Sequence, residues 1–181
     1  CALERPGRWV AEQTWPSPRI KIAHLPFGRY TLGAGVGSHE LKIQSPLTCG
    51  LSSVEWCSYG GSDGDYPAEQ AGDDGMSLCF DGLPLTERCE IFGAPIVELA
   101  FAVDKPVARV AVRLNDVAPD GAAYILDDTI LRARFREGYD REVFMEKGKT
   151  YKLDLLIYAT GFEVQKTGTW NKILGEGGQD L

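Results

Sequence analysis

Histidine is scarce in this chain, and the residue arrangements that accompany nucleophilic catalysis are missing. Only two histidines, His24 and His39, occur among 181 residues. A serine hydrolase of the α/β type needs a Gly-x-Ser-x-Gly turn. The nearest segments, at 35–39 and 50–54, lack the second glycine in place. Because the spacing gives neither histidine a nucleophile and a carboxylate, we expect no catalytic residue in this chain.

Patterns typical of metal and nucleotide sites are also missing. The five cysteines, at positions 1, 49, 57, 79 and 89, form no CxxC pair, and no HxxxH pair occurs. The glycines at 33, 35 and 37 fall short of Gly-x-Gly-x-x-Gly because Ser38 holds the last position. We therefore expect no resident metal and no cofactor. An odd number of cysteines favours reduced thiols in a cytoplasmic protein, with one or two disulfides as the alternative.

Long apolar runs and an excess of basic residues are absent as well. No apolar stretch approaches the ~20 residues of a membrane span, and the start of the chain lacks the basic and apolar regions of a signal peptide. The formal net charge is −7. An acidic surface repels phosphate backbones, so we expect neither a membrane nor a nucleic acid as partner.

What the chain does have is period-2 alternation of apolar residues, which indicates β-strands. Alternating strands are predicted at 96–103, 108–114, 129–135 and 151–157, with shorter ones at 20–22 and 76–80. The segment Pro119-Asp120-Gly121 predicts a turn between two of them. Many short strands with Gly/Pro turns predict an all-β fold, an antiparallel β-sandwich or barrel.

The stretch from Cys57 to Gly75 is rich in Gly, Ser, Asp and Pro and predicts a long loop. Its acidic residues are candidate calcium ligands, although their spacing does not match an EF-hand, and a solvated acidic loop is the default interpretation. They are Asp63, Asp65, Glu69, Asp73 and Asp74. Three aromatic residues beside them, Trp56, Tyr59 and Tyr66, are candidate ligand-binding residues because they could stack on a sugar ring.

Four arginines on the polar faces of two predicted strands form a possible stripe. They are Arg109, Arg113, Arg132 and Arg134. One hypothesis is that the stripe docks against an acidic partner surface. The favoured interpretation is a solvated face that is paired with Asp and Glu.

Several segments, taken in their order and spacing, resemble the C-terminal domain of the cocaine esterase, X-prolyl dipeptidyl aminopeptidase and glutaryl-acylase type of hydrolase. The resemblance runs from about Trp9 to Leu153. It is carried by Trp-Pro-Ser-Pro at 15–18, Pro-Ala-Glu-Gln at 67–70, Asp-Asp at 73–74, Ser-Leu-Cys-Phe at 77–80, Glu-Ile-Phe-Gly-Ala-Pro at 90–95, and Arg-Leu-Asn-Asp-Val-Ala-Pro-Asp-Gly at 113–121. The resemblance implies a jelly-roll of the galactose-binding-domain-like type. It also implies packing on a separate α/β-hydrolase domain, which supplies the catalytic Ser, Asp and His and which we expect to be missing here.

The tail departs from that pattern. Residues 154–164 and the segment after them resemble a short piece of a Baeyer–Villiger flavin monooxygenase around its Ala-Thr-Gly motif, here at 159–161. We therefore divide the chain into a jelly-roll domain at 1–153 and a divergent tail at 154–181, which we expect to complete the same sandwich. The glycine-rich flavin loops of that family are not present, so the likeness implies no flavin.

Two functions remain open at this point. The first is a non-catalytic accessory domain of an ester- or peptide-cleaving α/β-hydrolase, and self-association is a further possibility for its surfaces. The alternative is a free-standing module that binds a carbohydrate or another small ligand, as jelly-rolls do at their loop ends.

Overall fold

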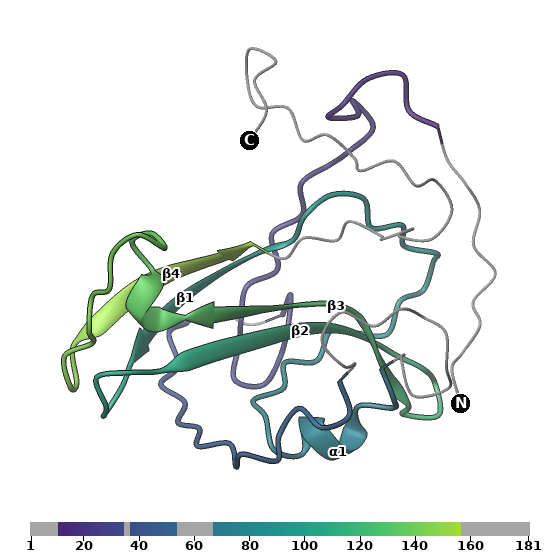
Figure 1. Cartoon of the computed structure of the whole chain (residues 1–181). Coiled ribbons are helices and arrows are strands. Elements are labelled where there is room, and N and C mark those ends of the chain that lie inside the picture. Colours follow the sequence, from purple (N-terminus) through teal and green to yellow (C-terminus); the bar gives the residue numbers. More distant parts are fainter. Residues whose placement is uncertain (1–10, 35–36, 54–66, 157–181) are drawn as a thin grey trace, which may run out of the picture.

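The structure is a computed structural model that describes residues 11–34, 37–53 and 67–156. Its elements follow the chain in an order dominated by strands (Figure 1). These are α1 (Ala71–Asp74), β1 (Ile96–Ala102), β2 (Arg109–Val117), β3 (Ala123–Arg132), the 3₁₀ turn η1 (Ala133–Phe135) and β4 (Thr150–Leu156). The strands pair antiparallel in two two-stranded sheets, β1 with β4 and β2 with β3. The expectation of an all-β, antiparallel domain is confirmed.

The β1–β4 sheet shows how the alternating sequence forms a half-buried strand. Leu99 lies opposite Leu153, and Val97 lies opposite Leu155. In β1 the exposure alternates strictly, with Val97, Leu99 and Phe101 on the more buried face. On β4, Leu153 and Leu155 are among the most buried apolar residues of the described part. The strands predicted at 96–103 and 151–157 are confirmed within the described residues, and their alternating burial arises because a pleated strand sends alternate side chains to one face.

The second sheet is a hairpin that the Pro-Asp-Gly turn closes. Gly121 donates its backbone N–H to the carbonyl of Ala118, and Ala118 donates to Ala122. The Asp120 carboxylate accepts from the N–H of Ala122 at 3.1 Å, and Gly121 has a φ of +89°, which favours glycine. The register shifts by one residue at Leu114 and Asn115, so the hairpin carries a bulge there.

Three strand predictions were wrong in whole or in part. Residues 20–22 form no strand, and Ile22 is 83% exposed. Residues 76–80 also form no strand, since the N–H groups of Met76 and Ser77 donate back to the carbonyls of Asp73 and Asp74 and continue the turn that begins in α1. The strand predicted at 129–135 starts earlier, at Ala123, and ends at Arg132, where η1 begins.

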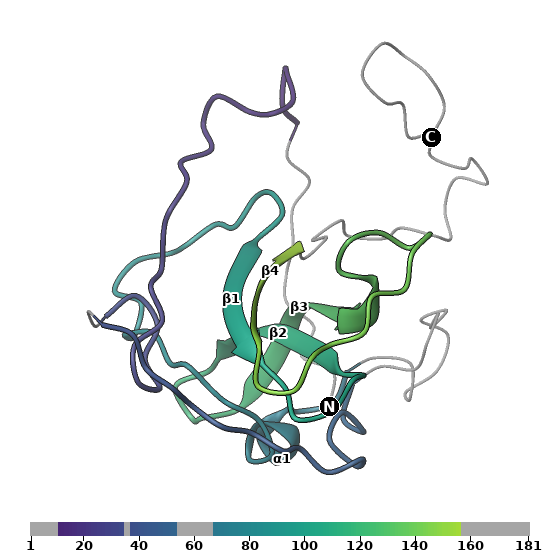
Figure 2. The same ribbon diagram turned by 90° about the vertical axis from the view of Figure 1, so that its left-hand side faces the viewer.

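The two sheets lie side by side in both views, and β3 contacts β4 (Figures 1 and 2). The most buried apolar residues come from β3, η1, β4 and the loop between them: Ala123, Ala133, Met145, Leu153 and Leu155. Arg136 ties this loop together, donating to the carbonyls of Ala133 and Val143 at 3.0 and 2.7 Å. Its guanidinium also lies over the Tyr151 ring of β4.

Helices contribute little to the described ranges. The α-helix α1 has four residues and η1 has three. None of the helices in the described ranges has the length and apolar character needed to cross a bilayer.

Candidate functional site

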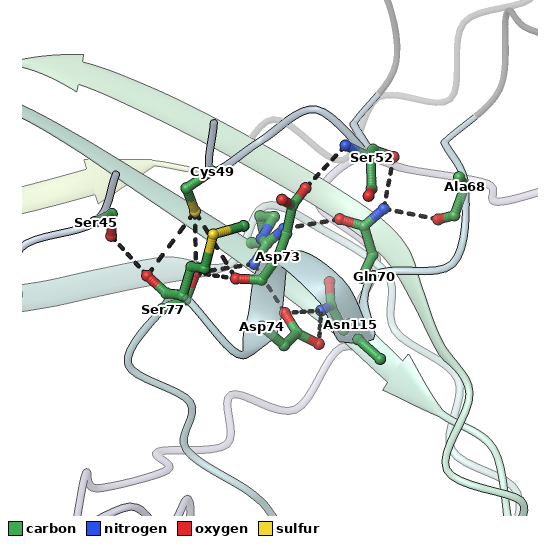
Figure 3. A network of polar contacts seen from close by, with 12 residues as sticks. Ser45, Cys49, Ser52, Ala68, Gln70, Asp73, Asp74, Ser77 and Asn115 are labelled. Carbon is green, nitrogen blue, oxygen red and sulfur yellow. Dashed lines mark hydrogen bonds and ion pairs between the residues drawn. The ribbon is translucent and has the colours of Figure 1, made fainter. Parts of the chain in front are cut away.

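The most elaborate side-chain arrangement is a polar cluster that joins α1 to the β2–β3 hairpin (Figure 3). Its centre is Arg113 of β2, whose side chain is only 14% exposed. The guanidinium donates to the Gln70 side-chain carbonyl at 2.8 Å, to an Asp74 carboxylate oxygen at 2.8 Å and to the Ser77 hydroxyl at 3.1 Å. We call Arg113 and the four residues that face its guanidinium, Gln70, Asp73, Asp74 and Ser77, the Arg113 clamp.

Gln70 and Asp73 extend the clamp to the loop at 49–53. Gln70 is fully buried, and its amide donates to the carbonyls of Ser52 and Ala68 at 2.8 and 2.7 Å. Asp73 is 2% exposed and accepts from the backbone N–H of Ser52 at 2.9 Å, while Arg113 lies 3.7 Å from the same carboxylate oxygen. Buried polar groups are stable only when they are hydrogen-bonded, and these two are.

The same segment is also bound to the first residue of β3 through backbone groups. Gln70 donates its N–H to the carbonyl of Ala123 at 2.9 Å. Ala123 in turn donates to the Glu69 carboxylate at 3.0 Å, and that carboxylate also accepts from the N–H of Ala71 at 2.9 Å. Residues 69–74 are thus held at two places on the hairpin, one on each strand.

The two neighbouring aspartates of the clamp differ in their electrostatics. Burial acts to raise the pKa of Asp73, but backbone hydrogen bonds from Gly50 and Ser52 and the charge of Arg113 outweigh it, so the pKa lies below its usual value. For Asp74, burial dominates over Arg113 and the hydrogen bond from Asn115, so its pKa is raised. Arg113 therefore compensates charge inside a poorly solvated cluster.

The clamp contains one hydroxyl, that of Ser77, and is bordered by two thiols, and the contacts of these groups indicate a structural role. The Ser77 hydroxyl donates to the carbonyl of Asp73 at 2.8 Å while it accepts from Arg113. The Cys49 thiol lies 3.8 Å from the same carbonyl, and burial raises the pKa of the Cys79 thiol. A thiol with a raised pKa is a poor nucleophile at neutral pH. Both histidines, His24 and His39, are exposed.

The acidic residues do not gather into a metal site where they are described. Asp63 and Asp65 lie outside the described residues, whereas Glu69, Asp73 and Asp74 accept the hydrogen bonds given above. Within 11–34, 37–53 and 67–156, no group of three or more His, Cys, Asp or Glu side chains is placed to hold a metal ion. Asp73 and Asp74 therefore serve the fold and do not form part of a solvated acidic loop.

The structure does not place the predicted aromatic ligand-binding residues. Trp56, Tyr59 and Tyr66 lie outside the described residues. Their stacking on a sugar, and with it the free-standing binding module, stays a prediction.

The arginine stripe divides into two parts. Arg113 was predicted on a solvated face that is paired with Asp and Glu; its pairing with Asp73 and Asp74 is confirmed, but the solvated position is wrong, because the segment at 70–77 covers it. Arg109 and Arg132 are exposed at the other end of the hairpin, and Arg134 follows in η1. These three line a shallow hollow together with Val107 and Ala108.

The sequence motifs contain every residue of the clamp, but they do not predict that these residues contact one another. Pro-Ala-Glu-Gln at 67–70, Asp73-Asp74, Ser77 and Arg113 all lie in motifs that carried the family resemblance. Gln70 and Arg113 are 43 positions apart in the sequence, and the hydrogen bond between them shows that these separate motifs build one polar cluster. One sequence signal could have indicated the cluster. Gln70, Asp73 and Asp74 have the i, i+3, i+4 spacing that places three polar side chains on the same face of a helical turn.

Comparisons with known proteins agree with these motifs. The chain matches the family described as X-Pro dipeptidyl-peptidase C-terminal non-catalytic domain over residues 2–168. It is 27% identical over 168 residues to the cocaine esterase of Rhodococcus sp. (strain MB1 Bresler), an alignment that covers 84% of this chain and 29% of that protein. The chain thus spans under a third of the length of this curated relative.

The family match continues past Leu153 into the tail, and neither of these similarities lends support to a flavin monooxygenase likeness there. The matched region contains the clamp, both sheets and the hairpin turn. The chain therefore belongs to the family of X-Pro dipeptidyl-peptidase C-terminal non-catalytic domains.

Proposed function

We propose that the chain acts as a non-catalytic accessory domain that packs on an α/β-hydrolase domain of the dipeptidyl-peptidase or acyl-esterase type. The observation that carries the proposal is the family match over residues 2–168, whose family is by description the non-catalytic part of a hydrolase. In this role the domain stabilises the hydrolase and shapes its substrate cleft. The chemistry is left to the Ser, Asp and His of the partner.

The described surface supports a docking role. Large apolar side chains stand well exposed on several loops, among them Ile22, Leu47, Leu51, Leu83 and Leu85. Burying such side chains against a partner is favourable because it removes apolar surface from water. A catalytic domain would bury part of this surface.

The finer fold assignment belongs to the same proposal. We infer a jelly-roll of the galactose-binding-domain-like type, with a boundary at Leu153 and a tail that completes the sandwich. In its support, Asp154, Leu155 and Leu156 lie in β4 and pair with Glu98, Val97 and Ile96 of β1. The first residues after the boundary thus already belong to a sheet.

The cytoplasmic location is also a proposal. Its support is the state of the described cysteines, since Cys49, Cys79 and Cys89 are all free thiols. Structural disulfides are typical of oxidising compartments, and free thiols are typical of reducing ones.

The direct test is association with a matching α/β-hydrolase domain that lacks its own C-terminal domain. The chain and the hydrolase domain are mixed, and binding is measured by calorimetry together with the hydrolase's melting temperature and its activity on an ester and an X-Pro peptide substrate. We expect binding, a raised melting temperature of the hydrolase and greater activity. An unrelated acidic β-sandwich of similar size is the control, and equal behaviour of the two proteins contradicts the proposal.

A further inference from the structure

The open end of the β2–β3 hairpin concentrates positive charge. Val107, Ala108, Arg109, Arg132 and Arg134 line a hollow of about 140 Å³. Arg109 and Arg132 are register partners, so their side chains leave neighbouring strands at directly opposite positions. Like charges in this arrangement destabilise a sheet unless an anion lies between or beside them.

Little of this charge is neutralised within the described residues. Among the ion pairs of those residues, the three arginines take part in one, between Arg134 Nε and Glu142 Oε1 at 3.6 Å. That distance is too long for a good hydrogen bond. Arg134 also lies over the Phe135 ring, at 4.9 Å from its centroid. Arg109 and Arg132, both exposed, thus line the hollow without a described carboxylate as partner.

The hollow lies at the uncovered end of a strand face that is covered at its other end, at Arg113. Arg109, Ala111 and Arg113 share one side of β2 because alternate residues of a strand point the same way. The segment at 70–77 covers this side at Arg113, whereas Arg109 and Ala111 are exposed. The clamp therefore holds β2, the strand that presents Arg109, at Arg113.

The size and the surroundings of the hollow indicate its occupant. Pockets for organic ligands usually measure roughly 300–1,000 Å³, so about 140 Å³ accommodates little more than one oxyanion group. Guanidinium groups bind carboxylates through two parallel hydrogen bonds. Exposed apolar residues border the arginines, with Val107 47% and Ile130 61% exposed. Arginine beside apolar side chains is typical of protein interfaces.

We propose that this hollow receives a carboxylate side chain from the surface of the hydrolase domain, and that Arg109 and Arg132 bind it. The inference rests on the proposed function and names the contact that orients the two proteins. A hydrolase surface is favoured over a second copy of this chain because each copy has a formal net charge of −7, so two copies repel each other overall.

The test compares the full chain with its Arg109→Glu/Arg132→Glu double variant in calorimetric titrations of the hydrolase domain at low and high salt. We expect the variant to bind about tenfold or more weakly and to lose most of the salt dependence of the wild type. Its melting temperature should stay close to that of the wild type, because both side chains are exposed. Arg29→Glu, which reverses one exposed charge elsewhere, is the matched control and should leave binding unchanged.

A second measurement separates this inference from the proposed function. The chain is titrated with acetate, with inorganic phosphate and with chloride at equal ionic strength, and the amide resonances of residues 107–109 and 132–134 are followed by NMR. We expect saturable shifts with acetate that the double variant does not show. Shifts of the same size with chloride, or a clear preference for phosphate, contradict a carboxylate site.

The combined outcomes are distinct. If the hydrolase binds the wild type and the double variant equally, the docking contact is wrong while the accessory role stands. If the wild type binds acetate but no hydrolase domain, the proposed function and the assigned partner are wrong while the carboxylate site stands. A dimer of the chain that the double variant dissociates would assign the hollow to a second copy and overturn the partner named here.

Discussion

Replacing Arg113 by methionine should destabilise the domain more than any other single substitution at a charged residue of the hairpin. The change removes hydrogen bonds to Gln70, Asp74 and Ser77 and the positive charge 3.7 Å from the Asp73 carboxylate. Removing one partner of a buried ion pair costs about 3–5 kcal/mol because the other charge stays buried without compensation. Against a typical free energy of unfolding of about 5–15 kcal/mol, this loss is a large fraction of the whole.

The pH dependence of this loss has a definite sign. In the wild type the pKa of Asp73 lies below 3.8, so the carboxylate contributes stability above that pH, and the contribution is lost as the pH falls through the depressed pKa. The pKa of Asp74 is raised, so its ionised form already opposes folding near neutral pH. Without Arg113 the pKa of Asp73 rises and that of Asp74 rises further, because the charge of Arg113 lowers both. The difference between wild type and variant is therefore largest near pH 7 and shrinks as the carboxylates protonate near pH 4 and below.

The assay is urea denaturation at pH 7 and at pH 4 of the wild type and two variants, Arg113→Met and Arg113→Met/Asp73→Asn/Asp74→Asn. The triple variant should recover part of the lost stability because it removes the uncompensated charges. Arg109→Met is the matched control on the same face of the same strand, and it should change stability by no more than about 0.5 kcal/mol. An Arg113→Met loss below about 1 kcal/mol, or one that is the same at both pH values, would refute the reasoning.

Two further predictions concern the core and the thiols. Leu153→Ala should lower the free energy of unfolding, measured by thermal denaturation, by about 2–5 kcal/mol. The reason is that Leu153 is 3% exposed and lies in β4 opposite β1. Ile96→Ala, at the exposed end of β1, is the control and should change the free energy of unfolding little. In labelling with a thiol reagent at pH 8, Cys89 should react quickly, and Cys79 should react slowly because burial raises the pKa of its thiol.

Both predictions have clear contrary outcomes. Equal losses in the free energy of unfolding for Leu153→Ala and Ile96→Ala would mean that Leu153 of β4 is not part of the hydrophobic core. For the thiols, single-cysteine variants report each rate separately, and a Cys79 rate that matches Cys89 under native conditions would mean that α1 and the segment after it do not shield the thiol.

The sequence predicted those parts of the fold that depend on local signals. Alternation at 96–103 and 151–157 predicted two strands, although not that they pair with each other. Pro119-Asp120-Gly121 predicted the hairpin turn, because strand faces and turns depend on neighbouring residues. Alternation alone was insufficient at 20–22. Within the described ranges that segment pairs with no strand, and a strand needs a partner for its backbone groups.

The candidate site was harder to predict because its contacts are non-local. A polar residue between apolar ones normally points to water, so Arg113 was assigned to a solvated face. The fully buried Gln70 and the nearly buried Asp73 reverse this assignment, since they need a donor that the hairpin supplies. Gln70, Asp73 and Arg113 come together only because residues 70–74 pack against β2 and β3. The spacing of these residues along the chain does not predict that contact.

The pairing of β1 with β4 has a consequence for the order in which the chain folds. Both strands of the β2–β3 hairpin lie between β1 and β4 in the chain, so we expect the hairpin to form from local contacts while β1 still lacks its partner. Closing the long loop between β1 and β4 comes at an entropic cost and is the slower step. During synthesis, β1 keeps an unpaired edge until residues 150–156 have left the ribosome. A chain that stops before Thr150 would therefore leave β1 without its partner and with an aggregation-prone edge.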